Sequence, residues 1–365
     1  MTQYCLIPIV LSCMVFLSGC GSSSSAGSSE PEEALTTTEP PIALSCDQGL
    51  TNEPIRCEPG FMLAGVEFSE RYVTAGDIEW HVVEAGDVAA PTILFLHGVP
   101  ESWYDWHRQM IDLASDYHVI AFDLKGFGRS DHPNADEAVG SGFYSASRVA
   151  TEVALLMDAL GLNSAVTLVS HDWGTLIASY LVFEQDTRFS AWARMSAPLG
   201  GDGQEIVDLN TQFALFQDHN RCQTVFSREQ FIFSLYGYDG ELGLNSSQPI
   251  ANEVVDRINE EWRFDERTPN TACKYYSDTP EITNPHFWSS TIIEMMSAIS
   301  FPVYLIQAVD DERQPLSLFD NTIADLPPGI ATLYPVPDSG HFMMSEQPDS
   351  VTMAILELID AAKFF

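Results

Sequence analysis

A carboxylate stands at the apex of a strand–turn–helix pattern near the middle of this 365-residue chain. In VTLVSHDWGTLIASYL (Val166–Leu181), an apolar, β-branched run stops at Ser-His-Asp-Trp-Gly and then resumes with helical spacing. A strand that turns sharply into a helix displays its apex residue, which here is Asp172. The helix beginning near Trp173 directs free N–H groups toward that apex and helps to keep the carboxylate ionised. Asp172 is therefore a candidate nucleophile, with a helix N-cap as the structural alternative.

Two further residues follow in an order that suits this chemistry. Asp311 comes after the apolar strand FPVYLIQAVD, and His341 lies in PDSGHFMMSEQP after the next strand. Nucleophile, acid and histidine, each at the carboxyl edge of a predicted strand, form an acid–base set that meets at one edge of the sheet. Asp310 is the alternative acid, but the spacing from Pro302 and Pro315 favours Asp311.

The elements around these residues alternate between strand and helix. Apolar strands predicted from PTILFLHG, HVIAFD, AVTLVS and AWARMSAP are separated by amphipathic helices, and YVTAGDIEWHVVEAG precedes them as two strands joined by a Gly-Asp turn. This rhythm predicts an α/β fold with a mostly parallel central sheet flanked by helices. It breaks between about Leu199 and Trp288, where Phe- and Tyr-rich helices predict an inserted helical cap.

The pattern divides the chain into five segments. They are a signal peptide (1–19), a flexible tether with a small Cys-containing segment (20–60), the first part of the core (61–198), the cap (199–288) and the second part of the core (289–365).

Four motifs together resemble the epoxide hydrolase and haloalkane dehalogenase branch of the α/β-hydrolases. They are HGVPESWYDW (97–106), DLKGFGRSD (123–131), SHDWG (170–174) and SGHFMMSEQP (339–348). The resemblance covers the chain from about Glu67 to the C-terminus and is loose in the cap. We interpret DLKGFGRSD as a structural glycine loop.

The resemblance implies a two-step mechanism. Asp172 attacks an electrophilic carbon and forms an alkyl ester, and His341, oriented by Asp311, then activates water to hydrolyse that ester. A serine at the apex would leave an ether without a hydrolysable carbonyl. The backbone N–H groups of Val99 and Trp173 are the implied oxyanion hole.

Other residues of the first motif have smaller expected roles. His97 and Gly98 shape the turn, and Pro100 is expected to follow a cis peptide bond. Trp103 and Trp106 could line a pocket or simply pack.

Epoxide opening also needs a proton donor for the leaving oxygen, and the resemblance implies tyrosines of the cap. In CKYYSD, Tyr276 is the first choice and Tyr275 the second, although Ser277 stands where the family usually has arginine. The segment expected to hold the other donor, TQFALFQDHN, contains no tyrosine, so Gln212 and His219 are the candidates there.

Alternatives remain for both donor and reaction. Tyr236 and Tyr238 could replace the missing donor. A haloalkane dehalogenase would use the indole N–H of Trp173 to stabilise the departing halide. Its second halide donor is often an asparagine at the position that Val99 holds here, and Trp262 of the cap is a weak substitute. The favoured reaction is therefore hydrolysis of epoxides to vicinal diols.

Other classes of function fit less well. A non-catalytic surface lipoprotein that retained the fold is disfavoured by the complete acid–base set. A serine esterase is disfavoured because Ser170 lies two positions early and points into the sheet. The expected substrate is a small apolar electrophile, and no cofactor or metal is expected.

The N-terminal segment ends in Leu-Ser-Gly-Cys, which resembles the cleavage box of bacterial lipoprotein signal peptides. Cys20 would then be the lipidated first residue of an exported protein, anchored to the cell envelope. MTQYC lacks the usual basic residues, so a transmembrane anchor or an ordinary cleaved signal remain alternatives. The Ser/Thr/Pro/Glu-rich segment that follows has the composition of a flexible tether.

Charge and cysteines add two constraints. Fifty-two acidic residues against 16 Lys plus Arg give a formal charge of −36, which disfavours binding to nucleic acid or anionic lipid. After the presumed signal and Cys20, four cysteines remain, and proximity favours the pairs Cys46–Cys57 and Cys222–Cys273 over the two other pairings.

Overall fold

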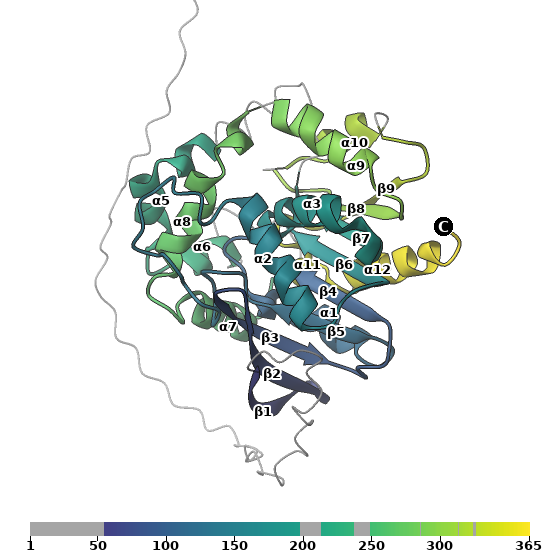
Figure 1. Cartoon of the computed structure of the whole chain (residues 1–365), viewed down its shortest axis with the longest axis horizontal. Coiled ribbons are helices and arrows are strands. Elements are labelled where there is room, and N and C mark those ends of the chain that lie inside the picture. Colours follow the sequence, from purple (N-terminus) through teal and green to yellow (C-terminus); the bar gives the residue numbers. More distant parts are fainter. Residues whose placement is uncertain (1–54, 198–212, 237–248, 285, 313, 324–325) are drawn as a thin grey trace, which may run out of the picture. The chain divides into compact units, whose positions relative to one another are not determined.

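The computed structural model describes residues 55–365, except 198–212, 237–248, 285, 313 and 324–325 (Figure 1). The expected signal segment, Cys20 and most of the tether lie outside these described residues. So do the donor candidates Gln212 and Tyr238, and Cys46 of one expected disulfide.

A single mixed sheet forms the centre of the fold. Nine strands lie in the order β1-β2-β3-β5-β4-β6-β7-β8-β9; pairing is antiparallel from β1 to β5 and parallel from β5 to β9. Their bounds are β1 Ile55–Leu63, β2 Val66–Ala75, β3 Ile78–Ala85, β4 Thr92–Leu96, β5 His118–Phe122, β6 Val166–His171, β7 Phe189–Met195, β8 Val303–Ala308 and β9 Ala331–Val336. The predicted α/β fold with a mostly parallel sheet is confirmed.

The sheet begins earlier than the sequence pattern predicted. The expected boundary at residue 61 falls inside β1, which starts at Ile55 and pairs with β2. Pro59 and Gly60 make this strand look like a loop, but the register shifts between Glu58 and Phe61. Proline is tolerated at such an irregularity in an edge strand.

Helices follow the parallel strands as predicted (Figure 1). Those of the core are α1 His107–Leu113, α2 Ala146–Ala159, α3 Trp173–Gln185, α9 Ile293–Ser297, α10 Ser317–Ile323, α11 Met343–Glu346 and α12 Pro348–Ala362. Helices α2 and α9 pack against α3, whereas α1 and α11 pack against α12. No described helix is both long and apolar enough to cross a lipid bilayer.

The described part of the chain between β7 and β8 is helical. It holds α5 His219–Phe226, α6 Phe231–Tyr236, α7 Asn252–Trp262 and α8 Thr268–Asp278, followed by two short helical turns, Pro280–Thr283 and Phe287–Ile292. The expected boundary at residue 288 falls inside the second of these turns, which continues directly into α9. A disulfide joins Cys222 of α5 to Cys273 of α8, as predicted.

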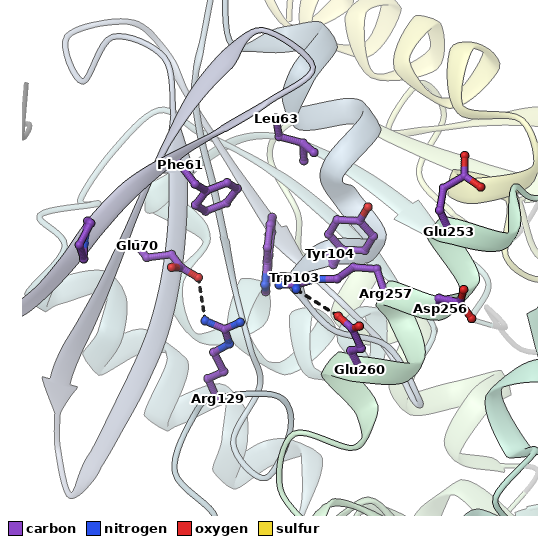
Figure 2. A pocket seen from close by; sticks show the side chains of 11 residues that line it. Phe61, Leu63, Glu70, Trp103, Tyr104, Arg129, Glu253, Asp256, Arg257 and Glu260 are labelled. Carbon is purple, nitrogen blue, oxygen red and sulfur yellow. Dashed lines mark hydrogen bonds and ion pairs between the residues drawn. The ribbon is translucent and has the colours of Figure 1, made fainter. Parts of the chain in front are cut away.

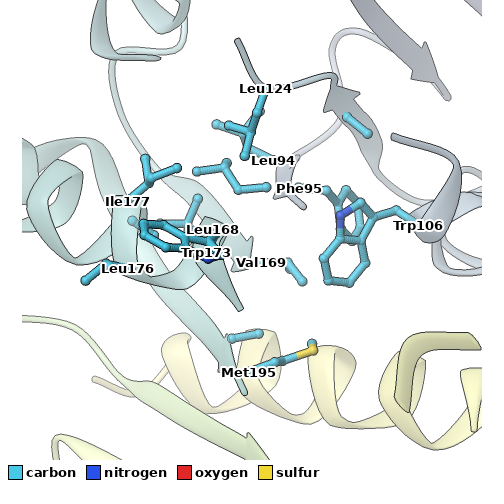
Figure 3. Close-up of a cluster of buried hydrophobic side chains, with 14 of the residues drawn as sticks. Leu94, Phe95, Trp106, Leu124, Leu168, Val169, Trp173, Leu176, Ile177 and Met195 are labelled. Atoms are coloured by element: carbon cyan, nitrogen blue, oxygen red, sulfur yellow. The ribbon is translucent and has the colours of Figure 1, made fainter. Parts of the chain in front are cut away.

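The core beneath the apex of the turn is apolar and closely packed. Figure 3 shows side chains of β4, β6 and α3 meeting there, among them Leu94, Leu168 and Ile177. Strand β6 is buried along its whole length, as expected of a central parallel strand covered on both faces. The ring of Trp106 is fully buried against Phe95, with 5.2 Å between the ring centres. Trp106 therefore packs in the core.

Candidate active site

The turn between β6 and α3 holds Asp172 in a rare backbone conformation. Its φ angle is +49°, in the left-handed region that non-glycine residues seldom adopt. The Asp172 N–H donates to the carbonyl of Met195 at 3.1 Å, and its own carbonyl accepts from the N–H groups of Thr175 and Leu176. These bonds stabilise the turn and project the carboxylate beyond the sheet, an arrangement typical of strained catalytic turns.

Two glycines leave the space that this turn needs. A methyl group on Gly98 would lie 2.6 Å from Cβ and 2.7 Å from Oδ1 of Asp172, and one on Gly174 would lie 2.4 Å from the carbonyl oxygen of His97. Ser170 does not compete as a nucleophile, because its buried hydroxyl contacts Thr175 and accepts from the indole of Trp192.

Residues from three separate loops meet at the Asp172 carboxylate. Nε2 of His341 lies 3.5 Å from Oδ2 of Asp172, and Nδ1 of His341 lies 2.9 Å from Oδ2 of Asp311. The other carboxylate oxygen of Asp311 accepts the N–H of Gln314 at 3.1 Å. Asp310 is exposed and its N–H donates to the carbonyl of Ser339, so the structure brings Asp311, and not Asp310, to the histidine.

These contacts determine the protonation states of Asp172 and His341. Burial opposes the ionisation of Asp172, but the hydrogen bond and charge of His341 hold the pKa of Asp172 below its ordinary value. Burial opposes protonation of His341 as well, yet Asp311 and Asp172 raise the pKa of His341 to about 10. At neutral pH the site therefore contains an imidazolium between two carboxylates.

A backbone N–H also points at the nucleophile candidate. Val99 donates to Oδ1 of Asp172 at 3.0 Å, and the Val99–Pro100 peptide bond is cis, as predicted. Trp173 begins α3, so its N–H is among the first-turn donors that have no partner within the helix. His97 stabilises the loop, since its Nε2 accepts from Leu124 and its Nδ1–H donates to the carbonyl of Gly98.

Glu101 and His171 have structural roles that the sequence did not predict, although both lie in the motifs HGVPESWYDW and SHDWG. One carboxylate oxygen of Glu101 accepts the N–H of Gly98 at 2.7 Å, and the other lies 2.5 Å from Nδ1 of His171. The Nε2–H of His171 donates to the carbonyl of His341 at 2.8 Å. These two side chains thus join the Val99 loop, the Asp172 turn and the His341 loop. The sequence did contain a signal for these two residues: Glu101 directly follows the turn at Val99 and Pro100, and His171 directly precedes Asp172.

The two tyrosines of α8 differ in their contacts. The hydroxyl of Tyr275 donates to the carbonyl of Lys125 at 2.7 Å, so its proton is already used in a hydrogen bond that links the cap to the core. The ring of Tyr276 meets the indole of Trp173 edge-on, with 4.8 Å between the ring centres. The ring of Tyr275 also meets that indole edge-on, at 5.7 Å, so both tyrosines are adjacent to the Asp172 turn. It is the engaged hydroxyl of Tyr275 that disfavours this residue as a donor.

Other donor candidates are engaged elsewhere. Nε2 of His219 lies 2.8 Å from Oδ1 of Asn270 near the beginning of α8. Tyr236 donates its hydroxyl to Asp105 at 2.9 Å. Trp262 packs among phenylalanines, including Phe231. None of these contacts directs a proton toward Asp172.

The glycine loop DLKGFGRSD is structural, in agreement with its interpretation from sequence. The Asp123 carboxylate accepts the N–H groups of Trp103 and Arg129 and contacts Nδ1 of His81. Thr271 of α8 donates to the carbonyl of Gly126 at 2.6 Å. The loop thus supports the cap helix that carries the tyrosines.

Comparison with known proteins extends these observations. A model of the alpha/beta hydrolase fold family matches residues 91–348. The chain is 39% identical over 101 residues to epoxide hydrolase 4 of Mus musculus, and this match covers 28% of this chain and 26% of that protein. It is 37% identical over 131 residues to epoxide hydrolase A of Mycobacterium tuberculosis, covering 36% of this chain and 39% of that protein. Each match thus spans well under half of the relative.

Solved structures show the same architecture. An epoxide hydrolase mutant of Vigna radiata superposes with a TM-score of 0.65 at 22% identity, covering 80% of this chain and 98% of that one. A laboratory-evolved variant of potato epoxide hydrolase gives a TM-score of 0.63 at 21% identity, covering 80% and 99%. At these identities the likeness is one of fold.

Proposed function

Because this chain belongs to the α/β-hydrolase fold family, we propose that it hydrolyses epoxides to vicinal diols through a covalent ester on Asp172. The two relatives described above carry the name epoxide hydrolase, which favours epoxides over haloalkanes as substrates. The observation that carries the proposal is the contact set around one carboxylate: His341 at 3.5 Å, the N–H of Val99 at 3.0 Å, and Asp311 behind the histidine at 2.9 Å.

In the first step, Oδ2 of Asp172 attacks one epoxide carbon while Oδ1 stays bonded to the N–H of Val99. The carbon–oxygen bond of the ring breaks, and its electron pair goes to the leaving oxygen. An alkoxide is a poor leaving group, so a donor must supply a proton as the bond breaks. Tyr276 suits this role because it lies against Trp173, the residue after the nucleophile.

The proton balance depends on His341. Formation of the ester removes the negative charge of Asp172, and with it part of the attraction that holds a proton on His341. That proton can then leave to replace the one lost by the donor. Neutral His341 next takes a proton from water, and the resulting hydroxide attacks the ester carbonyl carbon.

The oxyanion at Oδ1 is stabilised by the N–H of Val99 and, by the position of α3, by that of Trp173. When this intermediate collapses, the bond between the carbonyl carbon and Oδ2 breaks, and Oδ2 leaves as a hydroxyl of the diol with the proton that His341 took from water. The new carboxylic acid of Asp172 then returns its proton to His341, which restores the starting charges.

The decisive experiment separates the two steps. His341→Gln should accumulate the ester, visible as the mass of one epoxide added to the intact protein, whereas Asp172→Asn should form no adduct and turn over at least about a thousandfold more slowly. Turnover in heavy-oxygen water should place the label in Asp172 over repeated cycles. Turnover of Asp172→Asn at the wild-type rate would overturn the proposal. A panel of haloalkanes turned over faster than epoxides would favour a dehalogenase.

Neighbouring residues provide matched controls. Asp311→Asn should slow hydrolysis of the ester, whereas Asp310→Asn, one residue away and exposed, should leave it near the wild-type rate. Tyr276→Phe should slow ester formation more than Tyr275→Phe does. Equal effects within either pair would remove the assigned roles.

We also propose that the protein is exported and anchored to the cell envelope by a lipid on Cys20. The support is the Leu-Ser-Gly-Cys box and the tether-like composition that follows it. More than one acyl chain is needed for stable anchoring. Globomycin-sensitive processing and incorporation of labelled palmitate would support the proposal. If Cys20→Ala kept both, the proposal would be contradicted.

A further inference from the structure

Tyr236, the last residue of cap helix α6, packs against the loop that carries His341. Its ring stacks on that of Phe342, the residue after the histidine, with 4.1 Å between the ring centres and 26° between the planes. Both aromatic side chains are buried. The Phe342 ring in turn meets the imidazole of His341 edge-on, with 5.2 Å between the ring centres. A side chain of the cap therefore lies one ring away from the group that must activate water.

The other end of the same tyrosine is fixed by a hydrogen bond. Its hydroxyl donates to Oδ1 of Asp105 at 2.9 Å, and Oδ2 of Asp105 accepts the N–H of Ser102, also at 2.9 Å. Asp105 is buried, and a buried acceptor that loses its donor costs about 1–3 kcal/mol. The bond to Asp105 therefore holds the ring of Tyr236 in one position.

This bond reaches a second part of the candidate active site. Asp105 lies in the short helical turn that follows the Val99 loop. Between them, Glu101 accepts a hydrogen bond from the backbone of that loop at 2.7 Å. Through its hydroxyl Tyr236 thus contacts the segment that presents the oxyanion donor, and through its ring it contacts the segment that presents His341.

Contacts from the core hold the histidine loop by hydrogen bonds. Asp311 contacts the imidazole at 2.9 Å, and the Glu346 carboxylate accepts the N–H groups of the residues before and after His341, at 2.8 and 3.2 Å. These bonds fix the backbone and one ring nitrogen. The phenyl ring of Phe342 is held by packing, so its position depends on what covers it. The cap covers it with Tyr236.

We propose that Tyr236 is a positioning residue for His341 and acts through the ring of Phe342. The bond to Asp105 fixes the tyrosine, the tyrosine fixes the phenylalanine, and the imidazole stays aligned to take a proton from water. A displacement of about 1 Å at such a group can slow a reaction about a hundredfold. The inference rests on the function proposed above, and it gives the cap a role in hydrolysis of the ester. Ester formation depends on it less, because bonds within its own turn hold the nucleophile.

Single turnover of an epoxide, followed by rapid quenching and intact-protein mass spectrometry, measures the two steps separately. Tyr236→Leu removes both ring and hydroxyl, so ester hydrolysis should slow at least about tenfold while ester formation changes less than about threefold. Tyr236→Phe keeps a ring on Phe342 and should restore most of the rate, leaving hydrolysis about threefold slow. Equal slowing of both steps, or unchanged hydrolysis in Tyr236→Leu, would overturn the proposal.

A double-mutant cycle tests the route through the phenylalanine. Phe342→Leu should slow ester hydrolysis by a factor similar to that of Tyr236→Leu. If the tyrosine acts through Phe342, the double variant should be no more than about twofold slower than the slower single variant. Effects that multiply would show two independent roles and refute the assigned route.

Tyr180→Phe is the matched control for Tyr236→Phe. Tyr180 of α3 donates its hydroxyl to Glu281 of the cap at 3.1 Å, but its ring stacks on Phe287. The control thus also removes a bond from tyrosine to carboxylate between core and cap, and it should leave both rates within about twofold of the wild type. Slowing of ester hydrolysis by this control as large as that by Tyr236→Phe would contradict a specific role.

Folding and the proposed function are checked in the same experiment. Circular dichroism and Tm identify variants that fail to fold, and if Tyr236→Leu is one of them, Tyr236→Phe and Phe342→Leu still carry the test. A wild-type protein that forms no ester would overturn the proposed function together with this inference. Ester formation in the wild type, with hydrolysis unchanged in every folded variant, would overturn this inference alone.

Discussion

At the scale of single residues, reactivity depends on how closely the backbone surrounds Asp172. The positive φ of Asp172 and the missing side chain of Gly98 serve the same end, since both let the carboxylate lie against the N–H of Val99. An oxyanion donor is effective only when it is already in place before charge develops. A displacement of even about 1 Å can reduce the rate of reaction about a hundredfold.

Gly98→Ala tests this arrangement. The new methyl group would lie 2.7 Å from Oδ1 of Asp172, so we expect kcat/KM for an epoxide to fall by about a hundredfold or more, in a protein that remains folded. Gly329→Ala is the control: a methyl there meets no atom within 4 Å, and Gly329 lies before the start of β9, at the opposite end of that strand from the His341 loop. Its φ is +86°, so this variant also controls for backbone strain. Steady-state kinetics with circular dichroism would check the prediction, and similar kcat/KM values for the two variants would contradict it.

At the scale of elements, buried charges attach the antiparallel strands to the glycine loop. His81 of β3 contacts Asp123 at 2.8 Å and Glu70 of β2 at 3.2 Å. Burial disfavours its charge, but these two carboxylates raise the pKa of His81 to about 9. The folded protein therefore holds a proton that the unfolded chain releases near pH 6.5.

The sign of the resulting pH dependence follows. The contribution of His81 to stability is complete below pH 6.5, and it is lost as the pH rises through the folded-state pKa of about 9. We expect about 3 kcal/mol of the free energy of unfolding to disappear between pH 6.5 and 9.5 through this group. Urea unfolding of the wild type and of His81→Gln across this range would measure it. Parallel pH curves for the two proteins would contradict the assignment.

The disulfide between α5 and α8 acts at the same scale. It closes a loop with a sequence separation of 51 residues, so Cys222→Ala/Cys273→Ala should lower the free energy of unfolding by about 2–4 kcal/mol. Because α8 carries Tyr276 whereas His341 and Asp311 belong to the core, ester formation should slow more than ester hydrolysis. Single-turnover kinetics would separate the two steps. Reductant should reproduce the effect in the wild type and have none in the variant.

At the scale of the whole molecule, charge is the dominant feature. A formal charge of −36 with a pI near 4.2 means that acidic side chains repel one another across the surface. Such repulsion opposes the compact state and is screened by salt.

The protein should therefore gain stability as the ionic strength rises. We expect Tm to increase by about 3 °C or more between 0.02 and about 0.5 M NaCl at pH 7. KCl at the same ionic strength should have a similar effect, which separates screening from specific binding of sodium. Scanning calorimetry would measure the shift, and an unchanged or lower Tm in salt would contradict the prediction.

The sequence by itself determined the local parts of this protein. Buried parallel strands, the turn that displays Asp172 and the pairing of Cys222 with Cys273 could all be predicted, because short patterns and spacing govern each of them. The cis bond before Pro100 was instead implied by the family resemblance. The order of the candidate catalytic residues could be predicted for the same reason, since each follows a recognisable strand.

Only the tertiary structure decided which side chains meet across long stretches of chain. It distinguished Asp311 from Asp310, engaged Tyr275 with Lys125 and linked Glu101 to His171. It also packed Trp103 against Phe61 of the β1–β2 hairpin (Figure 2). The physical reason is that burial and hydrogen-bond direction depend on packing between distant segments. A one-residue change in position along a strand end or a helix turns a side chain away from one partner and toward another.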